Sequence, residues 1–127
     1  MNVTDATSSA AVVSTDRPAR YGKQLASHLG RRSGSTWDEE AGTGRILFNG
    51  GAAWVDVACS PGELRFDLTA GPDLVERLEG VIGGHLVRFG ATDEFVVAWT
   101  RSDGSAGTRQ DAASQAEYQR RPEQADN

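Results

Sequence analysis

Two helical patterns enclose a group of strand patterns in this chain, and that order leaves few folds open to it. In the first pattern the residues of one helix face recur at the spacing of Tyr21, Leu25, His28 and Leu29. This spacing predicts a helix from about Arg17 to Leu29. The second pattern opens at Gly71-Pro72-Asp73 and ends before Gly90, and its buried stripe is Leu74, Leu78, Ile82, His85, Leu86 and Phe89.

The segments around these helices have the composition or the alternation of β-strands. Three or four of them follow the first helix, at residues 36–38, 45–48, 53–58 and 64–68. Ala10 to Ser14 predicts an edge or first strand, and Phe95 to Trp99 predicts a last one. Because the strands are grouped, the order β-α-β(3–4)-α-β predicts an α+β fold, an antiparallel sheet with two helices on one face.

The 127 residues suffice for one domain with a modest core. We predict a disordered leader at residues 1–8, a single α+β domain at 9–101 and a disordered tail at 102–127. The tail prediction depends on composition. After Arg101 there are few apolar side chains apart from Tyr118 and alanines, so burial would not offset the entropy of ordering the chain.

Charge and cysteine content exclude several classes of function. The formal net charge is −5, and no run of Lys and Arg reverses it locally, so we expect neither nucleic acid nor an anionic membrane surface as a partner. Cys59 is the only cysteine, so no disulfide can form within the chain. The sequence has no secretory signal pattern and no apolar run of about 20 residues. These features predict a cytoplasmic protein.

The only two histidines occupy matching places on the two predicted helices, each within a His-Leu-x-Arg motif. His28 precedes Arg31 at the end of the first helix, and His85 precedes Arg88 near the end of the second. Histidine is the commonest metal ligand and changes charge near neutral pH, so both are candidate metal or ligand contacts if the helices lie side by side. The alternative is that each ring packs at the core margin. Two histidines do not complete a zinc site, which usually takes four ligands.

Two of the three tryptophans are assigned to strand faces by the residues that alternate with them. Trp99 alternates with Phe95 and Val97, which predicts a place in the core. Trp54 shares its strand face with Asp56, so it is predicted either to pack or to lie on an open sheet surface that could bind a ligand or a second copy of the chain.

Two runs of the sequence match a known family pattern, Thr15-x-x-x-x-Arg20-Tyr21-x-Lys23-Gln24-Leu25-x-x-His28 and Leu78-Glu79-x-Val81-Ile82-x-x-His85-Leu86-x-Arg88-Phe89. In these runs, and over roughly Ser8 to Thr100, the chain resembles a bacterial domain-of-unknown-function family. Its members are small proteins associated with, or fused to, siderophore-interacting FAD-dependent reductases. Members commonly have a second histidine where this chain has Arg31.

The resemblance implies a role in iron and siderophore uptake, and three hypotheses follow. The first is a non-catalytic accessory domain that binds a small-molecule ligand or a partner such as a siderophore-interacting reductase. The second is an enzyme that acts on a siderophore or a related small molecule with a histidine as general base, and the third is a structural module that homodimerises. No cofactor and no catalytic residue is predicted from the residues, whereas the resemblance allows iron or haem at the histidines. The candidate ligand-binding residues are Tyr21, Lys23, Gln24, His28, Trp54, His85 and Arg88.

Overall fold

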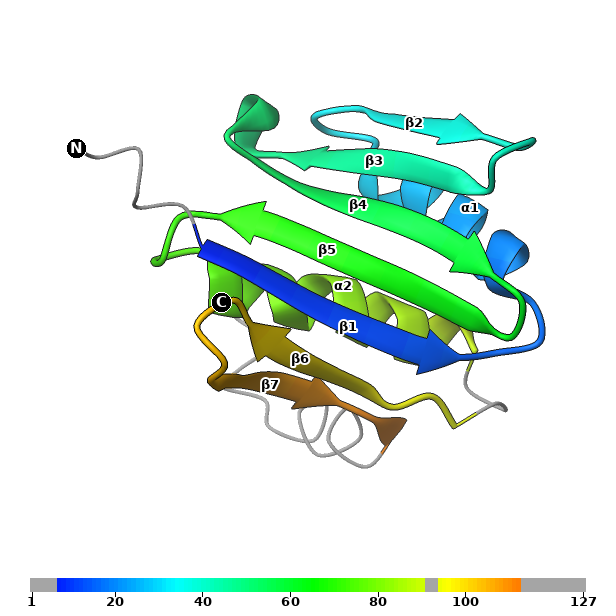
Figure 1. The fold of residues 1–127 in the computed structure, drawn as a ribbon. Helices are drawn as coiled ribbons and strands as arrows, with labels where there is room; N and C mark the ends of the chain where they lie inside the picture. The colour runs from blue at the N-terminus through cyan, green and yellow to red at the C-terminus, as the bar shows by residue number, and fades with distance from the viewer. Residues whose placement is uncertain (1–6, 91–93, 113–127) are drawn as a thin grey trace, which may run out of the picture.

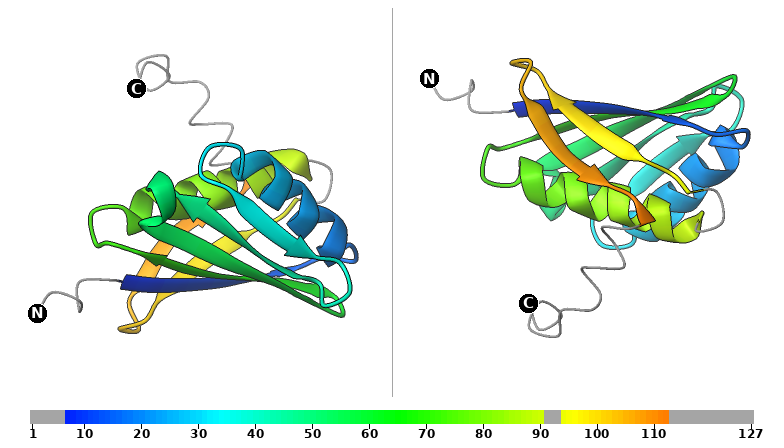
Figure 2. Two further views of the ribbon diagram at one scale, coloured as in Figure 1. Left: turned by 90° about the horizontal axis from the view of Figure 1, so that it is seen from above. Right: turned by 90° about the horizontal axis from the view of Figure 1, so that it is seen from below.

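Two helices lie on one face of an antiparallel sheet, as Figures 1 and 2 show for the computed structural model, which describes residues 7–90 and 94–112. Over these residues the strands follow the order β2-β3-β4-β5-β1-β6-β7 in the sheet, and all neighbouring pairs are antiparallel. This confirms the predicted α+β class. The elements are β1 (Thr7–Ser14), α1 (Pro18–Leu29), β2 (Ser35–Asp38), β3 (Thr43–Phe48), the single 3₁₀ turn η2 (Asn49–Gly51), β4 (Ala53–Ser60), β5 (Glu63–Ala70), α2 (Val75–Phe89), β6 (Val97–Arg101) and β7 (Ala106–Gln110).

The alternating residues of the middle strands form the core beneath the helices. On β5 Leu64, Phe66 and Leu68 are buried, and the residues between them are more exposed. The same alternation holds on β4, because side chains point to opposite faces of a strand with a period of two. On the outward face of these strands, charged side chains form ion pairs with one another. The guanidinium of Arg45 on β3, for example, donates to the carboxylate of Asp56 on β4.

Strand β1 lies inside the sheet. It pairs with β5 along its whole length, from Thr7 to Ser14, and with β6 at Ser9 and Ala10. It is therefore the first strand of the chain, as expected, but the expectation of an edge strand is wrong. The leader was predicted to extend to residue 8, whereas β1 already begins at Thr7, and residues 1–6 lie outside the described residues.

Strand β7 corrects the predicted boundary of the domain at residue 101. Ala106–Gln110 pairs with β6 and lies against α2, so this part of the predicted disordered tail is folded. The composition of this segment did not predict a strand, because polar contacts rather than buried apolar side chains hold β7 in place. Thr108 donates to the buried carboxylate of Glu79, and Gln110 accepts a hydrogen bond from the indole of Trp99. Residues 113–127 lie outside the described residues.

Trp99 lies in the core, as its alternation predicted. Its side chain is buried and stacks on Phe66 with ring centroids 5.9 Å apart. Gly83 on α2 shows why a glycine lies inside this helix. A Cβ atom there would collide with the side chain of Gln110, so the glycine allows β7 to approach α2 closely.

Candidate functional site

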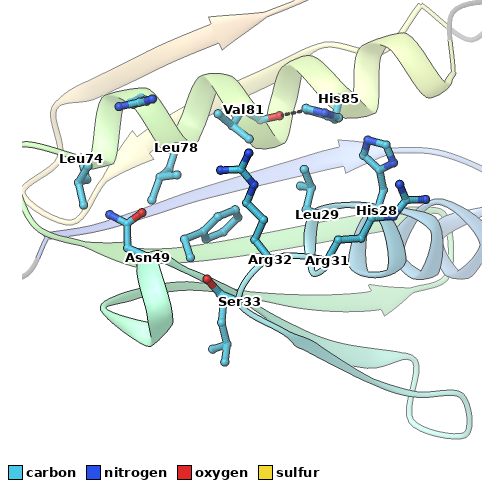
Figure 3. Close-up of a pocket in the computed structure, with 13 residues that line it drawn as sticks. His28, Leu29, Arg31, Arg32, Ser33, Asn49, Leu74, Leu78, Val81 and His85 are labelled. Carbon is cyan, nitrogen blue, oxygen red and sulfur yellow. Dashed lines mark hydrogen bonds between the residues drawn. The ribbon is translucent and has the colours of Figure 1, made fainter.

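A groove of about 700 Å³ opens between the two helices and the turn that follows β3 (Figure 3). It exists because α1 ends at Leu29 and leaves the first half of α2 without a helix beside it. The turn after α1 and the turn at η2 form its opposite wall. The lining residues are His28, Leu29, Arg31, Arg32, Ser33, Leu47, Phe48, Asn49, Leu74, Arg77, Leu78, Val81 and His85.

Two hydrogen bonds donated by backbone N–H groups hold the wall of the groove in place. The N–H of Leu47 donates to the carbonyl of Gly34 at 2.9 Å, and the N–H of Gly50 donates to the Ser33 hydroxyl at 2.9 Å. Gly34 has a φ of 107°, a backbone angle that residues with a side chain rarely adopt, so the tight turn depends on a glycine. These hydrogen bonds connect the two turns within the protein itself, so the wall does not need a ligand to form.

The groove is cationic although the whole chain is acidic. Arg31, Arg32 and Arg77 are exposed at its rim, and none of the residues that line it is an aspartate or a glutamate. The chain as a whole has a formal net charge of −5. The floor is apolar and consists of Leu29, Leu47, Phe48, Leu74, Leu78 and Val81. A cationic rim over an apolar floor suits a ligand that is both anionic and apolar.

The two histidines meet at one end of this groove. Their ring centroids lie 5.1 Å apart, with the ring planes tilted by 47°. Phe89 packs against both rings in T-shaped arrangements, at centroid distances of 5.5 Å from His28 and 6.1 Å from His85. Because His28 is exposed and His85 is half-buried, the pair is accessible from the solvent.

The hydrogen bond of His85 fixes which nitrogen faces outward. Its Nδ1 lies 2.8 Å from the carbonyl oxygen of Val81, and since a carbonyl can only accept, Nδ1 carries the hydrogen (Figure 3). Burial lowers the pKa of His85, and the bond to Val81 opposes this only in part, while the charges of Arg88 and His28 lower the pKa further. A neutral His85 therefore has a free lone pair on Nε2.

Three of the other candidate residues, Lys23, Gln24 and Arg88, lie near the pair without lining the groove itself. Lys23 and Gln24 line a smaller hollow of about 420 Å³ on the outer side of α1, which shares His28 and Arg31 with the groove. Lys23 also forms an ion pair with Glu39.

Arg88 is exposed on α2, close enough to His85 to affect its pKa. Tyr21 is buried instead, and its ring packs edge-on against Phe95 at 5.0 Å. It lines a separate polar hollow with residues such as Asp16.

Trp54 lies on the opposite side of the sheet from the groove. Its neighbours on β4, Ala53 and Val55, point into the core, so Trp54 faces outward, half-buried, with the guanidinium carbon of Arg45 5.1 Å from its ring centroid. The structure therefore does not bring Trp54 or Tyr21 to the histidines.

Sequence reasoning missed the arginines of the rim. Arg31 and Arg32 follow the first helix directly and Arg77 lies in the second, and none of the three was predicted to bind a ligand. The pair of arginines was a signal in itself, but Arg77 lies 45 positions further along the chain from Arg32. Only the packing of α2 brings it to the same groove.

Within residues 7–90 and 94–112, no three His, Cys, Asp or Glu side chains are grouped so that they could hold a metal ion. Among these described residues, the side chains of this kind that line the groove are the two imidazoles of His28 and His85. Over the same part of the chain, neither helix has the length and apolar character to cross a bilayer.

The fold and the groove define a small α+β domain with a basic hollow between two helices. Residues 10–100 match the model of a family described as an uncharacterized protein conserved in bacteria (DUF2218). The chain belongs to this family, which confirms the resemblance at that level. The association with siderophore-interacting reductases stays a prediction.

A solved structure is similar to this fold along most of its length. It is the NMR structure of PA4090 from Pseudomonas aeruginosa, with 25% sequence identity and a TM-score of 0.58. The similarity covers 73% of this chain and 94% of that one. No curated protein matches the chain.

Proposed function

We propose that this domain is a non-catalytic binding protein for a small amphipathic anion, which it holds in the groove between α1 and α2. The observation that carries the proposal is the composition of the groove wall: three arginines and two histidines, without a carboxylate, above an apolar floor. A volume of about 700 Å³ suits a small molecule.

Arginine is the side chain best suited to such a ligand. Its planar guanidinium donates paired hydrogen bonds to carboxylate, phosphate or catecholate oxygens and is weakly hydrated, so it loses little on binding. The rim arginines are exposed on two elements that border the groove opening, the turn after α1 and helix α2. Positive charges around a hollow with apolar walls raise the local concentration of anions, even when the net charge of the protein is negative.

The family resemblance supplies a candidate for the natural ligand. Ferric siderophores of the catecholate type are anionic chelates built on apolar aromatic rings, and they combine the two properties that the groove selects. A siderophore-interacting reductase is the corresponding partner in this proposal. The hypotheses of a histidine general base and of a homodimer stay predictions.

The binding proposal predicts a loss of affinity when the rim charges are removed. In the Arg32→Ala/Arg77→Ala double variant, anilinonaphthalene sulfonate, an amphipathic anion, should bind at least about 10-fold more weakly, because each charge-assisted hydrogen bond contributes about 1.5 kcal/mol or more. Fluorescence titration measures this directly. The neutral analogue N-phenylnaphthylamine should bind both proteins alike, since it depends on the apolar floor alone.

The matched control is Arg65→Ala, which removes an exposed arginine from the outer face of β5. Its dissociation constant for the sulfonate should equal that of the unmodified chain. Equal affinities for all three proteins would contradict the proposal, because the dye would then bind elsewhere or through apolar contacts only.

A further inference from the structure

The separation of the two histidine rings matches that of two imidazoles bound to one metal ion. With metal–nitrogen bonds of about 2.0–2.1 Å, two ring centroids around a shared ion lie roughly 4.5–5.2 Å apart at ligand angles of about 90–110°. The ring centroids of His28 and His85 lie 5.1 Å apart, within this range. They come from different helices, so the fold, and not a local sequence motif, sets this separation.

The contact of His85 with α2 is of the kind that orients a metal-binding imidazole. Histidines that bind metals usually donate their other N–H to a carbonyl or carboxylate, which fixes the tautomer and the direction of the free nitrogen. Nδ1 of His85 makes this bond to the carbonyl of Val81 at 2.8 Å. Phe89 packs against both rings in T-shaped arrangements.

The surrounding charges determine which form of metal would bind. The described residues offer no third protein ligand beside the pair, and the nearby cations Arg31 and Arg88 repel a bare divalent ion. A metal that arrives within an anionic chelator avoids this repulsion. The chelator fills the remaining coordination positions, and the rim arginines bind its oxygens.

We infer that His28 and His85 supply two imidazoles to a transition-metal ion carried by an anionic chelator, with the chelator lying in the groove. Imidazole suits nickel, copper, zinc and iron. The metal part of this inference depends on the ring geometry alone, whereas the chelator part rests on the proposed function.

Nickel nitrilotriacetate tests the inference, because it has a net negative charge and two adjacent coordination positions open to imidazole. Calorimetric titration of the untagged full chain should give one site. His28→Gln and His85→Gln should each weaken this site at least about 10-fold. The matched control is Ser27→Ala, an exposed neighbour of His28, which should leave the affinity unchanged.

Two further measurements keep the two proposals apart. Free imidazole should compete with the unmodified chain for the nickel chelate, which needs no variant at all. The sulfonate dye should still bind both histidine variants.

If the dye binds but the nickel chelate does not, or if both histidine variants bind the chelate as the unmodified chain does, the metal inference is overturned and the anion proposal stands. If the chelate binds through the histidines while the dye does not bind, the anion proposal fails and the metal site remains.

Discussion

Replacing Glu79 with alanine should lower the free energy of unfolding by about 3 kcal/mol, which is a large part of the stability of a small domain. Glu79 lies on α2, and its side chain is fully buried. Loss of the carboxylate leaves a cavity and removes the partner of several donors on three strands. Urea unfolding followed by circular dichroism measures the change.

The hydrogen bonds to Glu79 explain the size of this effect. Its carboxylate accepts from the Ser9 hydroxyl on β1 at 2.6 Å and from the Arg101 guanidinium on β6 at 3.0 and 3.1 Å. It also accepts from the backbone N–H and the hydroxyl of Thr108 on β7, both at 2.9 Å. One side chain thus ties three neighbouring strands to the helix above them.

The same contacts predict how stability depends on pH. Burial alone would raise the pKa of Glu79, but the hydrogen bonds from Arg101, Ser9 and Thr108 together hold it below its ordinary value of 4.5. A carboxyl whose pKa is lowered by folding stabilises the protein above the pKa of the unfolded state. We therefore expect this contribution to be lost as the pH falls below about 4.5, through the lower pKa of the folded state. In Glu79→Gln the unfolding free energy should fall less steeply over this acid range.

Glu76 provides a matched control for Glu79. It lies one turn earlier on α2 and approaches the same guanidinium, of Arg101, at 4.0 Å, but its side chain is 75% exposed. Glu76→Ala should change the unfolding free energy by less than about 0.5 kcal/mol, as exposed ion pairs usually do. Equal effects of the two substitutions would mean that burial of the carboxylate is unimportant.

A chain that ends at Ser105 should be less stable than the full chain by at least about 4 kcal/mol, because it lacks β7. Without this strand Glu79 loses both hydrogen bonds from Thr108, and the indole N–H of Trp99 loses Gln110 as its acceptor. The face of α2 that β7 covers is also exposed to water. Thermal unfolding should show a drop of more than about 15 °C.

A chain that ends at residue 112 is the control for this truncation, since it keeps β7 whole. It should unfold at nearly the same temperature as the full chain, because the sequence predicts no packing for the residues beyond it. If the two truncated chains were equally stable, β7 would contribute nothing to the domain, and the sequence-based boundary at residue 101 would be the correct one.

Local periodicity was sufficient to predict most elements of the fold. Leu64, Phe66 and Leu68 alternate because a strand buried on one face needs that pattern, and the helix stripes follow from the helical repeat in the same way. The end of α1 at Leu29 agrees with the predicted bound, and the residues that follow it, Gly30 and two arginines, favour the end of a helix. The matched positions of His28 and His85 pointed correctly to two helices that lie against each other.

The candidate site was predicted only in part, for a different reason. The histidines could be found because they are rare and lie in matching motifs. Tyr21 was included because it matches the family motif, and Trp54 because it shares its strand face with Asp56. The direction of a side chain depends on which face its element buries. In the structure Tyr21 packs against Phe95, and the side chain of Trp54 lies on the outer face of the sheet, away from the helices.

The sequence by itself determined the types and the order of the helices and strands up to β6, because these follow from hydrophobic patterns of short range. Tertiary structure alone decided that β7 belongs to the fold, since polar contacts to Glu79 and Trp99 hold it and hydrophobicity does not reveal such contacts. It also decided that Arg77 joins Arg31 and Arg32 in one groove. Residues far apart in the chain share a site only through the way in which their helices pack.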